Sequence, residues 1–132
     1  MGKPLHEVAE LLRRRGLVII ISDLWGDMSE FLTGLKHFVF NGHEVIVFHI
    51  LDPVEVNFPF DNIVKFVDLE TRKEVLLDPK IFKHKYLNKA NNYLNDIKVE
   101  CNKMNVDYRL MTTETPVDEA LFAFLAKRRM LL

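Results

Sequence analysis

The side chains best placed for chemistry are acidic residues that follow two apolar runs. Asp23 comes just after the run Leu17–Ile21, and Asp52 and Glu55 follow the run Glu44–Ile50. In open α/β sheets, ligands bind beside the carboxyl ends of the strands. Asp23 therefore has the most suggestive position, as a direct or water-mediated ligand of Mg²⁺, a hard ion held by few carboxylates and several waters.

The same acidic residues also have structural explanations. A single carboxylate such as Asp23 cannot hold Mg²⁺ tightly, because a tight site needs an adequate number of ligands; capping of the following loop or helix is the competing role. Asp52 precedes Pro53 at the end of a strand, where turn formation explains it without chemistry. We favour the structural roles. The alternative function is a metal-dependent enzyme, or a metal-binding adhesion-type domain, that uses Asp23 with Asp52 and Glu55.

Trp25 lies in the polar loop that begins at Ser22 and Asp23. We expect its ring to be exposed, where it would anchor a partner in the way of aromatic hot spots; packing against the adjacent loop is an equal alternative. Ser22, Asp23 and Trp25 are therefore the candidate partner-binding residues. A polar rim is predicted at the same edge of the sheet by Thr112, Thr113 and Thr115.

The other reactive side chains form no recognisable motif. The five histidines lack metal-ligand spacing, and His49, inside an apolar strand, is typical of a hydrogen-bonded core histidine. Cys101 is the only cysteine, so an internal disulfide is excluded; its place on an apolar helix face indicates a small core side chain. No catalytic loop or nucleotide fingerprint is present, so we assign no catalytic residue and no cofactor.

Size and charge narrow the class of protein. The 132 residues fit one domain, residues 1–132, and the net charge of −1 argues against a nucleic-acid binder. Arg13–Arg15 and Lys127–Arg129 fall near the ends of predicted helices, where cations complement the helix dipole; the alternative is a phosphate-binding patch. No apolar run of the sequence, Leu17–Ile21 included, is long enough to span a bilayer, and we expect a cytoplasmic protein.

Strands and helices alternate in the pattern of an α/β fold. The β-branched runs Leu17–Ile21 and Glu44–Ile50 are typical of strands that are covered on both faces of a parallel sheet. A helix is predicted between these two strands. Asp27 and Glu30 have the spacing of a capping box at its start, and Asn41–Gly42 ends it. Strand, helix and strand in this order predict a right-handed βαβ unit.

The remaining segments complete the predicted fold: a mostly parallel sheet with helices on both faces, plus a β-hairpin. In chain order they are a short helix from Leu5 to a left-handed stop at Gly16, hairpin strands Ile63–Asp68 and Glu74–Leu77, a long helix from Pro79 to Met104, a third parallel strand Val106–Met111 and a last helix that begins at Pro116.

Six short motifs follow one another along the chain: Arg15–Asp23, His43–Val45, Leu51–Glu55, Phe58–Phe60, Asp68–Thr71 and Tyr86. Their order resembles a bacterial family, the "domain of unknown function 58", whose C-terminal region is a von Willebrand factor A-like domain. The similarity runs from about Leu5 to Arg129, and the pair Arg72–Lys73 departs from it, since the family often has glycine in that turn.

The resemblance implies the later half of a von Willebrand A-like domain. Its metal-ion-dependent adhesion site draws on three loops, and only the third, Ser22 and Asp23, has a counterpart here, so Asp23 is the one metal candidate of an incomplete site. The resemblance also implies a non-catalytic protein-interaction module that works with MoxR-type AAA+ ATPases. We further expect a homodimer in which the Leu17–Ile21 strands of two copies pair antiparallel, because an unpaired apolar edge invites pairing.

Overall fold

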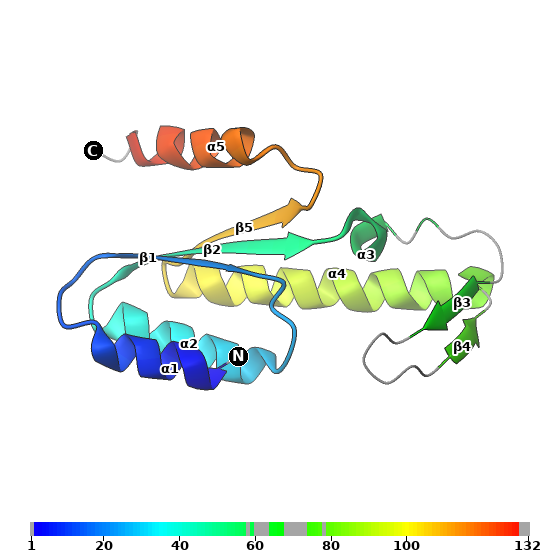
Figure 1. Ribbon diagram of the computed structural model, residues 1–132, viewed down its shortest axis with the longest axis horizontal. Coiled ribbons are helices and arrows are strands. Elements are labelled where there is room, and N and C mark those ends of the chain that lie inside the picture. The colour runs from blue at the N-terminus through cyan, green and yellow to red at the C-terminus, as the bar shows by residue number, and fades with distance from the viewer. Residues whose placement is uncertain (1, 58, 60–63, 68–73, 78, 130–132) are drawn as a thin grey trace.

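Three parallel strands form the main sheet of the protein. The structure is a computed structural model that describes residues 2–57, 59, 64–67, 74–77 and 79–129. The strands are β1 (Leu17–Ser22), β2 (Glu44–Leu51) and β5 (Asp107–Thr112), in the order β1-β2-β5 (Figure 1). β2 pairs in parallel with both neighbours, so the carboxyl ends of all three strands share one edge. The predicted α/β class is confirmed.

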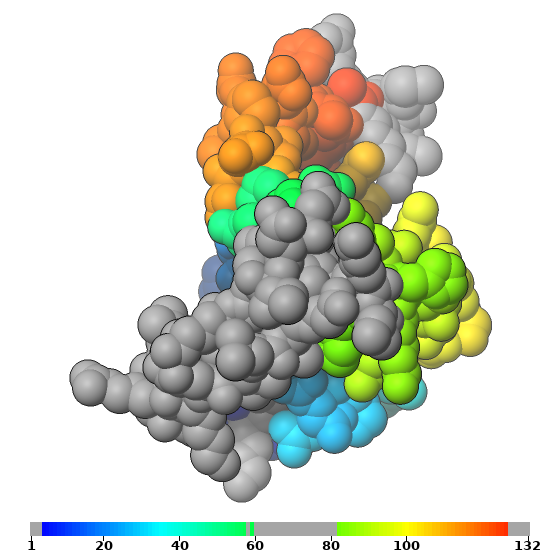
Figure 2. Space-filling view, turned by 90° about the vertical axis from the view of Figure 1, so that its right-hand side faces the viewer, coloured from blue at the N-terminus to red at the C-terminus, as the bar shows by residue number. Residues whose placement is uncertain are grey.

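Helices cover both faces of this sheet, as predicted. In Figure 1, α1, α2 and α4 lie on one side of the strands and α5 lies on the other. Figure 2 looks onto the carboxyl ends of the strands, with α5 in orange and red on one side and α4 and α2 in yellow-green and cyan on the other. The helices are α1 (Gly2–Leu11), α2 (Met28–Phe40), α3 (Pro53–Asn57), α4 (Pro79–Lys103) and α5 (Val117–Arg129).

The larger core lies between the sheet and α1, α2 and α4. The buried stripe of α2 (Phe31, Leu35 and Phe38) repeats at helical spacing, and it belongs to the same cluster as Val47 of β2 and Cys101 of α4. Burial in this apolar surrounding raises the pKa of the Cys101 thiol to about 11. The predicted role of Cys101 as a core side chain is confirmed.

The opposite face of the sheet is covered less completely. Ile46 and Phe48 of β2 pack with Phe124 of α5. The side chains of β1 alternate between the faces: Ile20 is buried in the larger core, whereas Leu17, Ile19 and Ile21 are 42%, 49% and 69% exposed. α5 therefore leaves the β1 part of this face open.

The two ends of α2 are fixed by local sequence. Asp27 is the N-cap, and its Oδ1 accepts hydrogen bonds from the Ser29 and Glu30 backbone N–H groups at 2.7 and 3.2 Å. Beyond the other end, Gly42 has φ +80°, and a Cβ atom there would lie 2.8 Å from Arg15 Nε. The Arg15 side chain therefore lies beside Gly42, just beyond the end of α2. The prediction placed the Arg13–Arg15 run at the end of the first helix, but that helix ends at Leu11 with no basic residue in its last turn.

The first helix is shorter than the sequence suggested. It ends at Leu11, and Gly16 does not have the positive φ that a left-handed stop requires. Leu11 is 77% exposed, and the three arginines after Leu12 offer no apolar side chain that would hold another turn against the core. Arg13–Arg15 consequently form an exposed connection to β1.

The predicted hairpin forms a separate two-stranded sheet. β3 (Val64–Val67) pairs antiparallel with β4 (Glu74–Leu77), and Val64 lies opposite Leu77. The turn predicted at residues 70–73 lies outside the described residues. The predicted long helix, third strand and last helix are confirmed as α4, β5 and α5.

Candidate functional site

The loop after β1 is shaped by the side chains of Ser22 and Asp23. Ser22 Oγ accepts a hydrogen bond from the Leu24 N–H at 3.0 Å, and Asp23 Oδ1 accepts one from the Trp25 N–H at 3.2 Å. Short polar side chains often bind the backbone two residues ahead in this way and close a turn. Asp23 therefore caps its own loop, which is the structural role that the sequence offered for it.

Leu24 turns the loop so that Trp25 faces outward. Leu24 has φ +52°, a conformation that is rare for a bulky residue, and its side chain is only 4% exposed. Its carbonyl oxygen accepts a hydrogen bond from the Tyr93 hydroxyl at 3.2 Å, so core burial and this bond together hold the turn. The Trp25 ring is 82% exposed, and its predicted exposure is confirmed.

His49 ties this loop to the sheet. The side chain is 1% exposed, with Nε2 at 2.9 Å from the Asp23 carbonyl oxygen and Nδ1 at 2.8 Å from the Tyr108 hydroxyl. A carbonyl oxygen can only accept, so Nε2 carries the proton and Nδ1 accepts from Tyr108. Desolvation lowers the pKa of His49, and burial raises the pKa of Tyr108. His49 is thus the hydrogen-bonded core histidine that the sequence predicted.

A short helix that the sequence did not predict, α3, follows β2. Asp52 Oδ1 accepts from the Val54 N–H at 2.8 Å, and Glu55 Oε2 accepts from the Asp52 N–H at 2.9 Å. These reciprocal bonds form a capping box, and Pro53 occupies the first helical position, where proline is favoured. The sequence Asp-Pro-Val-Glu, residues 52–55, therefore contained the signal for a helix start. The structural role predicted for Asp52 is confirmed.

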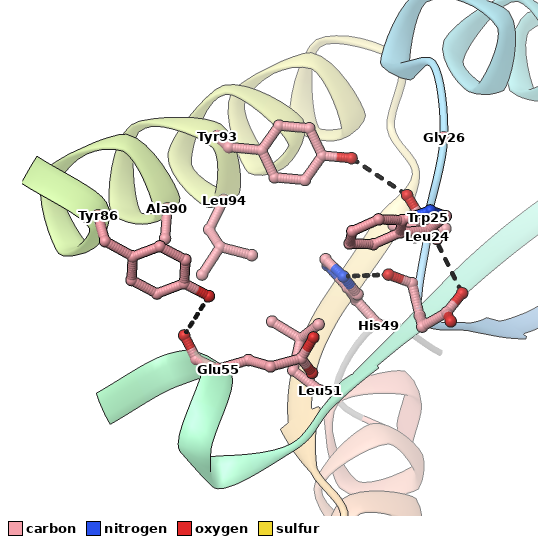
Figure 3. A pocket seen from close by; sticks show the side chains of 11 residues that line it. Leu24, Trp25, Gly26, His49, Leu51, Glu55, Tyr86, Ala90, Tyr93 and Leu94 are labelled. Atoms are coloured by element: carbon pink, nitrogen blue, oxygen red, sulfur yellow. Dashed lines mark hydrogen bonds between the residues drawn. The ribbon is translucent and has the colours of Figure 1, made fainter. Parts of the chain in front are cut away.

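These elements enclose a cavity of about 440 Å³ at the carboxyl edge of the sheet (Figure 3). Tyr86 reaches from α4 to the Glu55 carbonyl oxygen, to which its hydroxyl donates at 3.3 Å, and Tyr93 reaches to the loop after β1. The two tyrosines are seven residues apart on one face of α4. They thus connect this helix to the two other walls of the cavity, α3 and the loop after β1. The lining residues are Asp23, Leu24, Trp25, Gly26, His49, Leu51, Glu55, Tyr86, Ala90, Tyr93 and Leu94.

The cavity combines aromatic rings with negative charge. Asp23 and Glu55 are the charged residues of its lining, and no lysine or arginine of the described chain contributes to it. Both carboxylates favour the protonated form of His49, although desolvation outweighs them. Desolvation raises the pKa of Tyr86, and the Glu55 charge raises it further. Negative charge beside aromatic faces is a combination that attracts cations.

The structure brings together only part of the predicted acidic set. Asp23 and Glu55 line the same cavity, whereas Asp52 caps α3 and does not. Among the described residues, no group of three or more His, Cys, Asp or Glu side chains is arranged to hold a metal ion. The metal-dependent alternative therefore has no ligand set in this part of the chain.

The predicted threonine rim lies beside the cavity without lining it. Thr115 Oγ1 accepts from the Thr112 N–H at 3.0 Å, and the Thr113 N–H donates to the Leu51 carbonyl oxygen at 3.0 Å. These bonds shape the turn between β5 and α5. Sequence reasoning missed Tyr86 and Tyr93 as cavity walls. Tyr86 was singled out only through the family resemblance, and both residues fall at helical spacing in the predicted long helix, which is also typical of core side chains.

The sequence pattern of one protein family, described as "Protein of unknown function DUF58", matches residues 2–93, more than half of the chain. The chain belongs to this family. The match of this DUF58 chain covers the loop after β1, α3 and α4 as far as Tyr93; β5 and α5 lie beyond it, although the resemblance was expected to reach Arg129. No curated protein and no solved structure matches the chain.

None of the helices in the described ranges has the length and apolar character needed to cross a bilayer.

Proposed function

We propose that this DUF58 chain is a non-catalytic protein-interaction module whose partner adds a strand to the open edge of β1. By this open edge we mean the side of β1 that faces away from β2, where no strand of the described chain pairs. The observation that carries the proposal is the exposure of Leu17, Ile19 and Ile21 beside that edge. An apolar edge strand of this kind is a template for pairing with another chain.

The backbone of β1 presents the same three residues to a partner. The Gly16 carbonyl oxygen accepts from the Glu44 N–H at 3.0 Å, so the backbone groups of Gly16 point toward β2. Backbone groups alternate between the two sides of a strand, and those of Leu17, Ile19 and Ile21 therefore point toward the open edge. A partner strand would bind the backbone of the residues whose side chains it also helps to cover.

The partner that we propose is a second copy of the chain. β1 has the sequence LVIIIS, without the charge or proline that proteins place on edges to prevent pairing. Antiparallel pairing of two β1 strands about a two-fold axis would join both sheets and align their exposed apolar faces. Beside this face, Ile21, Val117 and Leu121 line a hollow of about 210 Å³, which extends the apolar surface toward α5.

The family supports a more specific assignment. We propose that the chain corresponds to the later half of a von Willebrand A-like domain. On the same grounds, a MoxR-type AAA+ ATPase is the proposed physiological partner. Ser22, Asp23 and Trp25 are its proposed contact residues, since the Trp25 ring is 82% exposed at the carboxyl edge.

Sedimentation equilibrium over a range of micromolar concentrations tests the homodimer. We expect a dimer for the natural sequence and a monomer for Ile19→Lys, which places a charge in the centre of the proposed interface. Leu11→Lys is the matched control, because Leu11 is also exposed but lies on α1; it should remain a dimer. A concentration-independent monomer for the natural sequence, or a dimer unaffected by Ile19→Lys, contradicts the proposal.

A further inference from the structure

The connection between α1 and β1 carries an unusual concentration of positive charge. Arg13, Arg14 and Arg15 are consecutive and exposed, and no ion pair among the described residues involves them. The cavity at the other end of β1 carries the opposite charge, from Asp23 and Glu55. Within one copy the two features lie at opposite ends of the same strand.

Antiparallel pairing of β1 brings these opposite ends together. The backbone groups of Leu17, Ile19 and Ile21 face the open edge, so a two-fold axis at Ile19 uses all three residues of each copy. In this register Leu17 lies opposite Ile21 of the second copy. The strands end at Ser22 and begin at Leu17, so beyond them the pairing brings the loop that contains Asp23 and Trp25 beside the second copy's Arg13–Arg15 run.

We propose that each copy supplies the cation for the other copy's cavity, through its Arg13–Arg15 run. In an antiparallel pair the Cβ atoms of opposite residues, here Leu17 and Ile21, are about 5 Å apart. The arginine run ends two residues before Leu17, and Asp23 follows two residues after Ile21, so a long arginine side chain can reach the loop after β1. A guanidinium group there would pair with the Asp23 carboxylate. It would also stack on the Trp25 ring, since arginine binds favourably over the face of an aromatic ring. The inference rests on the proposed homodimer and names the contacts that complete it.

The carboxylates of the cavity have capacity for such a partner. Asp23 Oδ1 accepts local bonds from the Trp25 N–H and the Ser22 hydroxyl, and Glu55 Oε2 accepts from the Asp52 N–H. The second oxygen of each carboxylate has no hydrogen bond to a described residue. Glu55, on α3, adds a second negative charge to the same cavity. Of the three arginines, Arg13 and Arg14 are the better candidates, because Arg15 lies over Gly42.

A charge-swap experiment tests the contact. One variant, Arg13→Glu with Arg14→Glu, reverses the cations, and a second variant, Asp23→Lys, reverses the acceptor. Each alone places like charges together in both halves of its homodimer, and we expect the dimer dissociation constant to rise more than about tenfold. In a mixture, every charged pair of the heterodimer is again opposite in sign, so dimers should return at concentrations at which neither variant dimerises alone.

Matched controls separate this contact from general charge effects and from misfolding. Lys36→Glu with Lys98→Glu makes the same charge change at exposed positions of α2 and α4, and it should leave the dissociation constant within about twofold. Should Asp23→Lys fail to fold, Asp23→Asn retains the acceptor for the Trp25 N–H, and we expect it to weaken the dimer about threefold or more. Circular dichroism monitors folding for each variant.

The outcomes distinguish this inference from the proposed function. Dimers whose affinity is unchanged by the arginine and Asp23 variants overturn the arginine contact and leave the strand-mediated homodimer in place. Loss of dimers in both variants without recovery in the mixture overturns the contact as well. A natural sequence that is monomeric at every concentration overturns both. Recovery in the mixture, together with quenching of Trp25, the only tryptophan, supports the proposed contact.

Discussion

The buried histidine of β2 should make the stability of the fold depend on pH. His49 is neutral in the native state, because burial lowers its pKa below the usual 6.5, whereas in the unfolded chain it regains that ordinary value. Between the two pKa values the unfolded state binds the extra proton, so stability is lost as the pH falls through about 6.5. Asp23 and Glu55 act in the opposite direction and limit the effect.

The size of the effect follows from proton linkage. Between about pH 7.5 and about pH 5.5, protonation of a histidine with a pKa of 6.5 stabilises the unfolded state by up to about 1.4 kcal/mol. This upper value applies if folded His49 stays neutral throughout. Replacement by His49→Gln removes the linkage. It should also cost about 1–3 kcal/mol at neutral pH, because the Asp23 carbonyl and the Tyr108 hydroxyl would lose well-placed partners.

Urea unfolding at several pH values measures this linkage. The difference in unfolding free energy between the natural sequence and His49→Gln should narrow as the pH falls from about 7.5 to about 5.5, while the other four histidines contribute equally to both proteins. Nuclear magnetic resonance of the imidazole reports the folded pKa of His49 directly. A folded pKa at or above 6.5, or a free-energy difference that does not change with pH, would refute the reasoning.

Two further predictions concern the framework. Gly42→Ala should destabilise the fold by about 1 kcal/mol in urea unfolding, because the residue has φ +80° and a Cβ atom would crowd Arg15; Gly16→Ala, at a site with open space and no positive φ, should change little. Cys101 is fully buried with a pKa of about 11, so a thiol reagent at about pH 8 should react only after unfolding; rapid reaction of the native protein would contradict this burial.

The sheet was predictable because its strands carry strong local signals. The β-branched runs at Leu17–Ile21 and Glu44–Ile50, and the capping residue Asp27, agree with the structure to within a residue or two. The first helix was overextended because Gly16 was interpreted as its stop. The structure ends that helix at Leu11, since tertiary packing, and not the next glycine, decides how many turns are held.

The candidate site was predictable only in part. Asp23 and Trp25 were found because the carboxyl end of a parallel strand is a usual place for ligand groups. Tyr86 and Tyr93 were not, because a helical stripe does not show which of its members reach past the core to a loop 69 residues earlier in sequence, as the Tyr93 bond to Leu24 does. Burial and long-range bonds of this kind appear only when the elements are placed.

The apolar strand and the arginine run would have different roles in the proposed dimer. Burying Leu17, Ile19 and Ile21 provides affinity, but strand pairing has a period of two residues. If one β1 strand slipped by two residues along the other, apolar side chains would still lie opposite apolar side chains, and the backbone groups at the open edge would still pair. The apolar contact alone would therefore select the register only weakly. The opposed charges at the ends of β1 respond to such a slip, because it moves the second copy's Arg13 and Arg14 away from Asp23. Affinity would therefore come from the strand, and the register of the dimer from Arg13–Arg15 and Asp23.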